Sequence, residues 1–399
     1  MNALALRNFA TIKYQIQFWV DMQRDGARQE PQIPAGTIFK AMVCRPMIGA
    51  RSWLQVDQKA RLAPLKQLTG STREMVVSDS TLSRVLPKWD LGPTRMASYA
   101  LHQRLKQAGL ATVELSTGRR VRLAVADGSD FGGHLKSVLG FAGKIYQAVD
   151  LEESDGRGHE LVTSRALLMR AQEYLGPGFA THVLYDGLMA DRIDFRFMRK
   201  VVKSHLVVKT REETLEIIQS SKQVWSSWPE DKLKRCGVEI VRGTDVERGI
   251  VYEVRAQSGI IWDGLEFPLN LAWVRETHLK GKYAGQTLEF WVITTDESLS
   301  AEELRELAHK RWAIENNGFK ELNERLGSKA AYVKNPQAKQ AELLMGFIGM
   351  TLLKAFKAYL ETLEEWRKLT VRKTKNWLAW AIESGIGIGG VVGPVAVPP

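Results

Sequence analysis

The chain lacks the features that mark several common protein classes. It has only two cysteines in 399 residues, Cys44 and Cys236, and they form no metal or redox pattern. No stretch reaches the ~20 apolar residues that a membrane helix needs, and no hydrophobic signal core follows Met1. We therefore expect a soluble, cytoplasmic protein from a reducing compartment, with no membrane partner.

Histidine is also scarce, with 7 residues, and repeats are absent. His134, His182 and His309 stand at no spacing typical of metal ligands, so they are given no role. Low complexity is confined to the tail Gly385–Pro399, which is too rich in Gly and Pro to predict a helix.

Positive charge is abundant and lies on one side of the sequence. The whole chain carries +11, and residues 1–126 hold 19 Lys+Arg against 8 Asp+Glu, which is 19 − 8 = +11. The remaining residues therefore hold 56 − 19 = 37 basic and 45 − 8 = 37 acidic side chains. A basic first part and a neutral second part suit a protein that grips phosphates at its front and does chemistry behind. A solubilising charge bias is the alternative.

Residues 1–115 have the pattern of helical segments between Pro and Gly, and the pattern changes to strands from Arg119. Helical spacing and a capping box of Ser300 with Glu303 predict further helices over 192–204, 301–326 and 336–369. Apolar and β-branched runs predict strands at Arg120–Asp127, Lys144–Leu151, Leu161–Met169, Thr181–Asp186, His205–Lys209, Val238–Val241, Ile250–Val254, Ile260–Trp262, Leu269–Val274 and Leu288–Thr294. Of these, Lys144–Leu151 is expected to be the antiparallel neighbour of Arg120–Asp127.

Three carboxylates stand out against this layout. Asp127 and Asp186 each end an apolar run, and Glu315 lies in the helix that begins after Ser300. Two divalent cations roughly 3.5–4 Å apart must share oxygen ligands, and Mg²⁺ prefers carboxylates. The set therefore predicts a two-metal site that cuts phosphodiesters. Taken singly, each acid is more often a turn residue or a surface ion-pair partner, and Asp130 and Asp191 are weaker rivals.

The segments Phe290–Asp296, Lys310–Asn316 and Phe319–Leu322 resemble DDE transposases of bacterial insertion sequences, most closely the family named after insertion sequence four. Asp127-Gly128-Ser129 and Asp186-Gly187 resemble the first two aspartate motifs of that family. The likeness covers about residues 119–335. It implies an RNase H-like α/β core, interrupted by a mostly β insertion, preceded by an all-α DNA-binding domain and followed by C-terminal helices.

The resemblance also implies domain limits and a mechanism. The predicted regions are 1–118 (helical, basic, DNA-binding), 119–234 (core, first part), 235–287 (β insertion), 288–335 (core with the glutamate helix) and 336–399 (C-terminal helices with a tail). Asp127, Asp186 and Glu315 would bind two Mg²⁺, which Mn²⁺ can replace, for cleavage and strand transfer of DNA. The expected partners are the transposon ends, target DNA and a second copy of the chain, in the bacterial nucleoid, with no small-molecule substrate.

The family signature around the glutamate is only half present. Arg311 and Glu315 match it, whereas Ala308 and Leu322 replace its Tyr and Lys. This departure puts normal handling of the DNA end in doubt. It keeps open two alternatives to an active transposase: a catalytically inactive DNA-binding descendant, and a nuclease of the same fold that performs no strand transfer.

Several other side chains are candidates for DNA contact. Ser78–Leu86 predicts a capped helix whose polar residues could enter a major groove, or an ordinary amphipathic helix. Trp273 is either a base-stacking residue, as the resemblance implies, or part of the sheet packing. Arg311 would orient Glu315 or touch a phosphate. The predicted DNA-binding residues are Ser80, Ser83, Arg84, Lys209, Arg211, Trp273, Arg275, Arg311 and Lys320.

Overall fold

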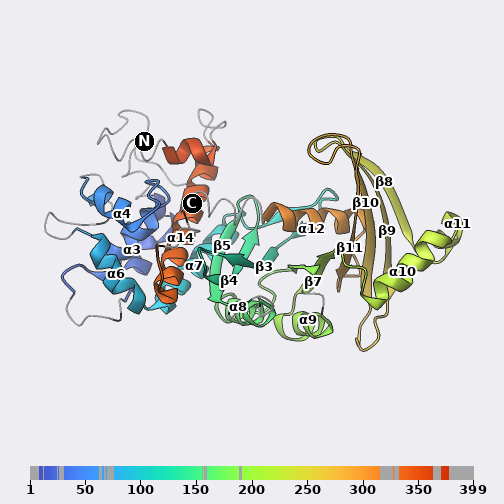
Figure 1. Cartoon of the computed structure of the whole chain (residues 1–399), viewed down its shortest axis with the longest axis horizontal. Helices are drawn as coiled ribbons and strands as arrows, with labels where there is room; N and C mark the ends of the chain where they lie inside the picture. Colours follow the sequence, from blue (N-terminus) through green and yellow to red (C-terminus); the bar gives the residue numbers. More distant parts are fainter. Residues whose placement is uncertain are drawn as a thin grey trace. The chain divides into compact units, whose positions relative to one another are not determined.

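A mixed nine-stranded sheet with helices around it makes this an α/β protein, as the computed structural model shows in Figure 1. The strand order is β5-β4-β3-β6-β7-β11-β10-β9-β8. The strands are β3 (Leu123–Asp130), β4 (Leu135–Ala142), β5 (Gln147–Glu153), β6 (His182–Asp186), β7 (His205–Thr210), β8 (Glu239–Asp245), β9 (Ile250–Ile260), β10 (Leu269–His278) and β11 (Thr287–Thr294).

The structure describes most, but not all, of the chain. The described residues are 9–154, 156, 160–187, 191–314, 327, 332–362 and 370–376, apart from positions 12, 25, 27–30, 63–64, 67–68 and 70–75 in the first range. They divide into two compact units. Unit 1 comprises 1–111, 128–167 and 316–399, and unit 2 comprises 112–127 and 168–315. These units combine stretches from different predicted domains, whose boundaries stay predictions.

Unit 1 is built around the C-terminal helix α14 (Pro336–Leu360), which packs against α3 (Ala35–Cys44), η1 (Leu86–Lys88) and α7 (Leu91–Gln107). Its apolar core includes Ile38, Phe39, Trp89 and Phe356, each at most 1% exposed. The other elements of its N-terminal part are α2 (Ile16–Asp21), α4 (Trp53–Ala60) and α6 (Asp79–Val85). The predicted helical character of residues 1–115 is confirmed for the described residues up to Gln107, whereas Val113–Glu114 forms the short strand β1.

Helix α14 is the one described helix that is long and apolar enough to cross a membrane. Of its most apolar window, 83% is buried inside the fold. This is the burial that a core helix of a soluble protein shows. The sequence predicted this helix over 336–369; the structure describes it to Leu360, and 363–369 lie outside the described residues.

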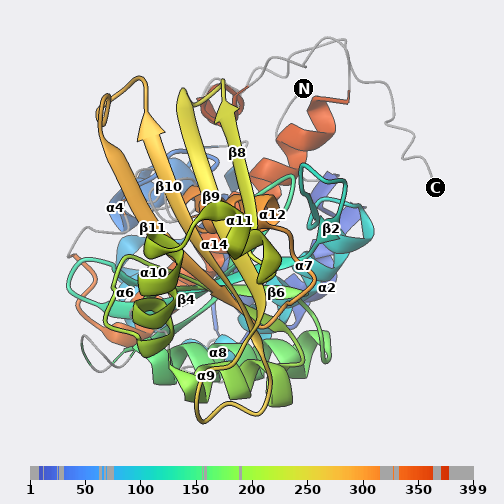
Figure 2. The ribbon, with the colours of Figure 1, turned by 90° about the vertical axis from the view of Figure 1, so that its right-hand side faces the viewer.

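Unit 2 holds a run of six neighbouring strands. β6 pairs in parallel with β3 and with β7, and β7 pairs antiparallel with β11. Antiparallel pairing then continues through β10, β9 and β8, which stand side by side in Figure 2. The strands expected over 235–287 therefore extend the same sheet as β7. The prediction of two separate strands, Ile250–Val254 and Ile260–Trp262, was wrong, because residues 250–260 form the single 11-residue strand β9.

Helices cover both faces of this extension. Helix α12 (Ala301–Ile314) lies against one face, and α10 (Glu216–Ser227), followed by α11 (Glu230–Arg235), lies on the opposite one (Figure 1). The predicted capping box begins α12 as expected: Glu303 N–H donates to Ser300 Oγ at 3.3 Å, and Ser300 N–H donates to Glu303 Oε2 at 3.0 Å. The predicted helix 192–204 is confirmed as α9 (Arg192–Phe197) and the π-helical turn η3 (Met198–Val202).

The prediction of a strand at Leu161–Met169 was wrong. This segment belongs to helix α8 (Glu160–Leu175). Its buried residues are Ser164, Leu167, Leu168 and Ala171, which recur at the spacing of one helix face. The adjacent β-branched Val162 and Thr163 suggested a strand, but neither is buried, so packing of the helical stripe outweighs their local preference.

The first predicted strand was also wrong in its limits and its partner. Arg120–Val121 (β2) pairs with Val113–Glu114 (β1) in a separate two-stranded sheet, while β3 runs on to Asp130. The segment predicted as its neighbour, 144–151, contains β5, which pairs with β4 instead. β4 was not predicted because polar Lys136 and Ser137 interrupt its apolar pattern. Both are fully buried, and Lys136 pairs with Glu153.

Candidate active site

Two carboxylates and a lysine fall at one level of three neighbouring strands of unit 2. In the parallel pair β3–β6, Val125 is opposite Leu184. Counting two residues onward puts Asp127 and Asp186 at the same level. In the pair β6–β7, Asp186 is opposite Lys209. Because neighbouring strands are about 4.8 Å apart and alternate side chains share a face, the two aspartates project close together from one face of the sheet.

A glycine after Asp186 allows the chain to leave β6 at this point. The backbone N–H of Gly187 donates to Asp186 Oδ1 at 2.7 Å. A Cβ on Gly187 would lie 2.4 Å from Thr210 Oγ1 and 2.8 Å from Thr210 Cα. Glycine at position 187 is therefore required by the close approach of β7, whatever the chemistry of the neighbouring carboxylate.

Arg311 reaches both carboxylates from α12. Its Nη1 lies 3.6 Å from Asp127 Oδ2, and its Nη2 lies 3.3 Å from Asp186 Oδ1. The side chains of Arg311 and Asp127 are 12% and 18% exposed, whereas that of Asp186 is 44% exposed. One guanidinium therefore contacts two carboxylates at the edge of the solvent. The sequence predicted Arg311 as a site residue but did not predict these partners.

The helix that presents Arg311 is tied to the sheet by a buried carboxylate on β10. Glu276 Oε1 accepts from Arg305 Nε at 2.6 Å and lies 2.7 Å from His309 Nε2. Burial by itself would raise the pKa of Glu276, but the hydrogen bond with His309 and the charge of Arg305 outweigh it and lower that pKa to about 2. Sequence reasoning missed this anchor, because Glu276 lies 29 residues before its partner Arg305.

A cavity of about 280 Å³ opens beside Asp186. Three cations line it: Lys209, Arg211 and Arg311. Burial lowers the pKa of Lys209 to about 8; the neighbouring charge of Glu276 opposes this shift, and that of Arg311 adds to it. The remaining lining residues are Gly187, Thr210 and Glu212, and the sequence had signalled neither Thr210 nor Glu212. A hollow with cations beside a carboxylate pair can hold an anionic oxygen near a carboxylate-bound cation.

The third predicted carboxylate, Glu315, lies outside the described residues, and so does Lys320. In the described part of the chain, no three His, Cys, Asp or Glu side chains are grouped to hold a metal ion. Asp127 and Asp186, two of the three predicted metal ligands, are described. They are hard oxygen donors at one level of adjacent strands, and both contact one cationic group, the guanidinium of Arg311.

Two of the predicted DNA-binding residues, Trp273 and Arg275, lie on the face of the sheet opposite to α12, where other side chains contact them. Trp273 is 6% exposed and stacks on Trp291, with ring centroids 5.5 Å apart and planes at 4°. Arg275 donates from Nε to Glu289 Oε1 at 3.0 Å. This burial favours the sheet-packing alternative for Trp273.

The predicted capped helix of the N-terminal region is present as α6 in unit 1. Ser78 Oγ accepts from the backbone N–H of Thr81 at 3.1 Å, as a helix cap does. Ser80, Ser83 and Arg84 are all exposed on α6. Both a DNA-recognition helix and an ordinary amphipathic helix would expose these side chains, so DNA contact by α6 stays a prediction.

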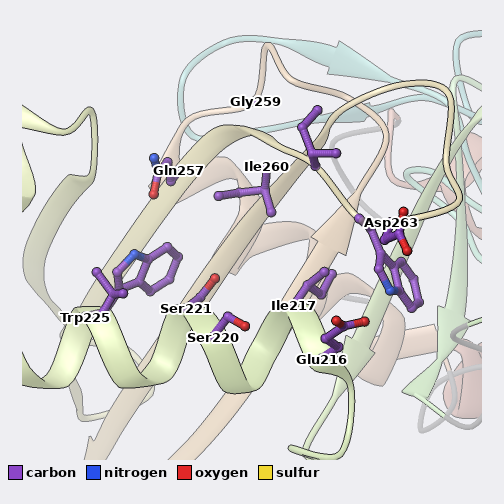
Figure 3. Close-up of a pocket in the computed structure, with 12 residues that line it drawn as sticks. Glu216, Ile217, Ser220, Ser221, Trp225, Gln257, Gly259, Ile260 and Asp263 are labelled. Atoms are coloured by element: carbon purple, nitrogen blue, oxygen red, sulfur yellow. The ribbon is translucent and has the colours of Figure 1, made fainter.

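A second cavity, of about 410 Å³, lies between α10 and the end of β9 (Figure 3). Figure 3 shows Ile217 and Trp225 on the helix and Ile260 across from them, with Glu216 and Asp263 at one end. No Lys or Arg occurs among the described residues that line it. Glu216 at its acidic end pairs with Arg192, whose Nη2 lies 3.6 Å from Glu216 Oε2.

No protein-family model matches the chain, and no curated protein matches it.

Proposed function

We propose that this protein is a metal-dependent DNA transposase of the DDE type. The observation that carries the proposal is the convergence of Asp127 and Asp186, 59 residues apart in sequence, on the guanidinium of Arg311. Two carboxylates at one level of adjacent strands supply two of the three oxygen-donor side chains that we propose for a divalent-metal phosphodiester site, and Glu315 is the third.

The sheet topology supports an RNase H-like core. Strands β3, β4 and β5 follow one another in sequence and are neighbours in the sheet, and β6 and β7 join on the other side of β3 in parallel. An antiparallel meander of three strands extended by two parallel strands is the arrangement we expect of such a core. Asp127 lies on its first strand, and Asp186 ends its fourth.

In this proposal, Asp127, Asp186 and Glu315 hold Mg²⁺. When bound, the metal activates the attacking oxygen and stabilises the leaving one. The cationic side chains of the site bind phosphate and neutralise the carboxylates. Lys209 and Arg211 bind the phosphates next to the cleaved bond from the cavity wall, and Arg311 holds the two aspartates together from α12 in the metal-free site. Double-stranded DNA ends, target DNA and a second copy of the chain are the partners, in the cytoplasm.

The test is cleavage of DNA that carries the ends of the element, with Mg²⁺ or Mn²⁺, by the full chain. We expect nicking at those ends that is lost by at least about a thousandfold in Asp186→Asn and Glu315→Gln, because a metal ligand is removed. Asp130→Asn is the matched control, since Asp130 lies on the same strand as Asp127 and its Oδ1 accepts from Gly133 N–H at 2.8 Å. Equal activity in all four proteins would overturn the site.

One observation favours a second candidate, a DNA-binding descendant that has lost catalysis. Ala308, where the family signature has Tyr, is 1% exposed, so the methyl group of this residue offers no hydroxyl to a DNA end. Leu322, at the signature Lys position, lies outside the described residues. End-specific binding without cleavage in any metal would support this candidate, and cleavage without joining of the products would support a nuclease.

A further inference from the structure

We infer that Arg311 is the built-in counter-ion of the Asp127–Asp186 pair, and that a divalent cation binds this pair only by displacing the guanidinium. The inference rests on the proposed function and goes beyond it. It names a competition between a side chain and the metal, and it makes Arg311 a positioning residue that exchanges its partner when the site is loaded.

The geometry places the guanidinium where a shared cation belongs. Arg311 uses a different nitrogen for each carboxylate, at 3.6 Å and 3.3 Å. Two carboxylates at one level of adjacent strands repel each other, and a positive group in contact with both removes that repulsion. The same carboxylate oxygens are the donors that a divalent ion needs, so the two cations cannot occupy them together.

Burial makes this competition strong enough to measure. The Arg311 side chain is 12% exposed, so solvent screens its contacts only in part. The Asp186 side chain, at 44%, is open to solvent on the side of the cavity. A metal can therefore approach Asp186 from the cavity. The released guanidinium stays in the same cavity, where a DNA phosphate can accept hydrogen bonds from two of its N–H groups.

Lys209 provides a matched comparison within the same cavity. It is opposite Asp186 in the strand register, yet its Nζ lies over the Phe290 ring, 4.1 Å from the centroid. It therefore adds one positive charge near the carboxylates without lying between them. Removing Lys209 or Arg311 changes the net charge of the cavity equally, but only Arg311 competes for the carboxylate oxygens.

The experiment measures Mn²⁺ binding to the full chain without DNA, by titration calorimetry and by the electron paramagnetic resonance signal of free Mn²⁺. The variants are Arg311→Met, Arg311→Lys, Lys209→Met and Asp186→Asn. We expect Arg311→Met to bind Mn²⁺ about tenfold more tightly than the wild type, and Lys209→Met to change the affinity by less than about threefold. Arg311→Lys keeps the charge on a group that cannot contact both carboxylates, so its affinity should fall between the two.

Each outcome decides the inference. Unchanged or weaker binding in Arg311→Met, with circular dichroism like that of the wild type, overturns it. An equal gain in Lys209→Met also overturns it, since the effect would then be long-range charge alone. If Arg311→Met is misfolded, wild-type affinity in Arg311→Lys overturns it. Undetectable Mn²⁺ binding in every protein does so too, while DNA cleavage tests the proposed function independently. Wild-type affinity in Asp186→Asn would overturn both.

Discussion

Two arginines of this protein meet carboxylates in opposite ways. In unit 1, Arg45 pairs with Glu342, and both side chains are 1% exposed. Arg45 also donates to the carbonyl oxygens of Ala50 and Arg51 at 3.2 Å and 3.0 Å. In unit 2, Arg311 contacts two carboxylates that are partly open to solvent. The first arrangement locks distant segments together, and the second leaves its members able to change partners.

The difference follows from desolvation. A fully buried ion pair has lost its water, so either partner becomes costly when the other is removed. A pair at a cavity wall keeps part of its hydration, and a metal ion or a phosphate can replace a protein partner without burying a bare charge. The same chemical groups therefore stabilise the fold in unit 1 and are suited to ligand exchange in unit 2.

The largest effect is expected at the buried pair. Arg45→Met should lower the free energy of unfolding by about 3 kcal/mol, because Glu342 stays buried and loses one of two cationic partners, while Lys339 remains 3.4 Å from its Oε2. Urea denaturation followed by circular dichroism measures this. Arg61→Met is the control, since the Arg61 side chain is 63% exposed in its pair with Asp57, and it should cost less than about 0.5 kcal/mol. Equal losses in both variants would remove the contrast.

The next effect concerns the anchor of α12. Glu276→Gln should lower stability by about 2 kcal/mol at pH 7, because the folded pKa of Glu276, about 2, lies below its unfolded value near 4.5. A lowered carboxyl pKa stabilises the fold above the unfolded value. That contribution is lost as the pH falls from about 4.5 toward 2. The gap between wild type and variant in urea denaturation should therefore shrink below pH 4.5, and a constant gap would contradict this origin.

A smaller effect is expected in the pH dependence of DNA affinity, which should reveal the contribution of Lys209. Lys209, with a pKa of about 8, loses its charge as the pH rises from 7 to 9, so wild-type affinity for DNA ends should fall about threefold more than that of Lys209→Met. Fluorescence anisotropy at constant ionic strength measures it. Arg275→Met is the comparison, because Arg275 already pairs with Glu289, and its pH dependence should follow the wild type.

The smallest effect is expected for the stability of Arg311→Met, and it is the direct counterpart of the Arg45 experiment. The loss should be about 1 kcal/mol or less without metal, since the contacts are partly hydrated. Added Mg²⁺ should raise the melting temperature of this variant more than that of the wild type. A loss as large as that of Arg45→Met would mean that Arg311 serves the fold rather than ligand exchange.

Local patterns were enough to predict several elements. Ser300 and Glu303 are three residues apart, so their capping box forms within one turn and needs no distant partner. The strands that end near Asp186 and Lys209 are short apolar runs whose pattern is typical of buried parallel strands. The segment 161–169 was missed because two β-branched residues are a weak local signal, and packing of its buried stripe decided for a helix.

The sequence by itself determined the candidate acids, the strand that each aspartate follows or occupies, and the start of the helix that carries Arg311. Only the tertiary structure decided which side chains meet. The alignment of Asp127 with Asp186 depends on the register of β3 and β6, and the contact of both with Arg311 depends on how α12 lies on the sheet. These relations join residues more than 50 positions apart, where no local periodicity extends, so packing and strand pairing set them.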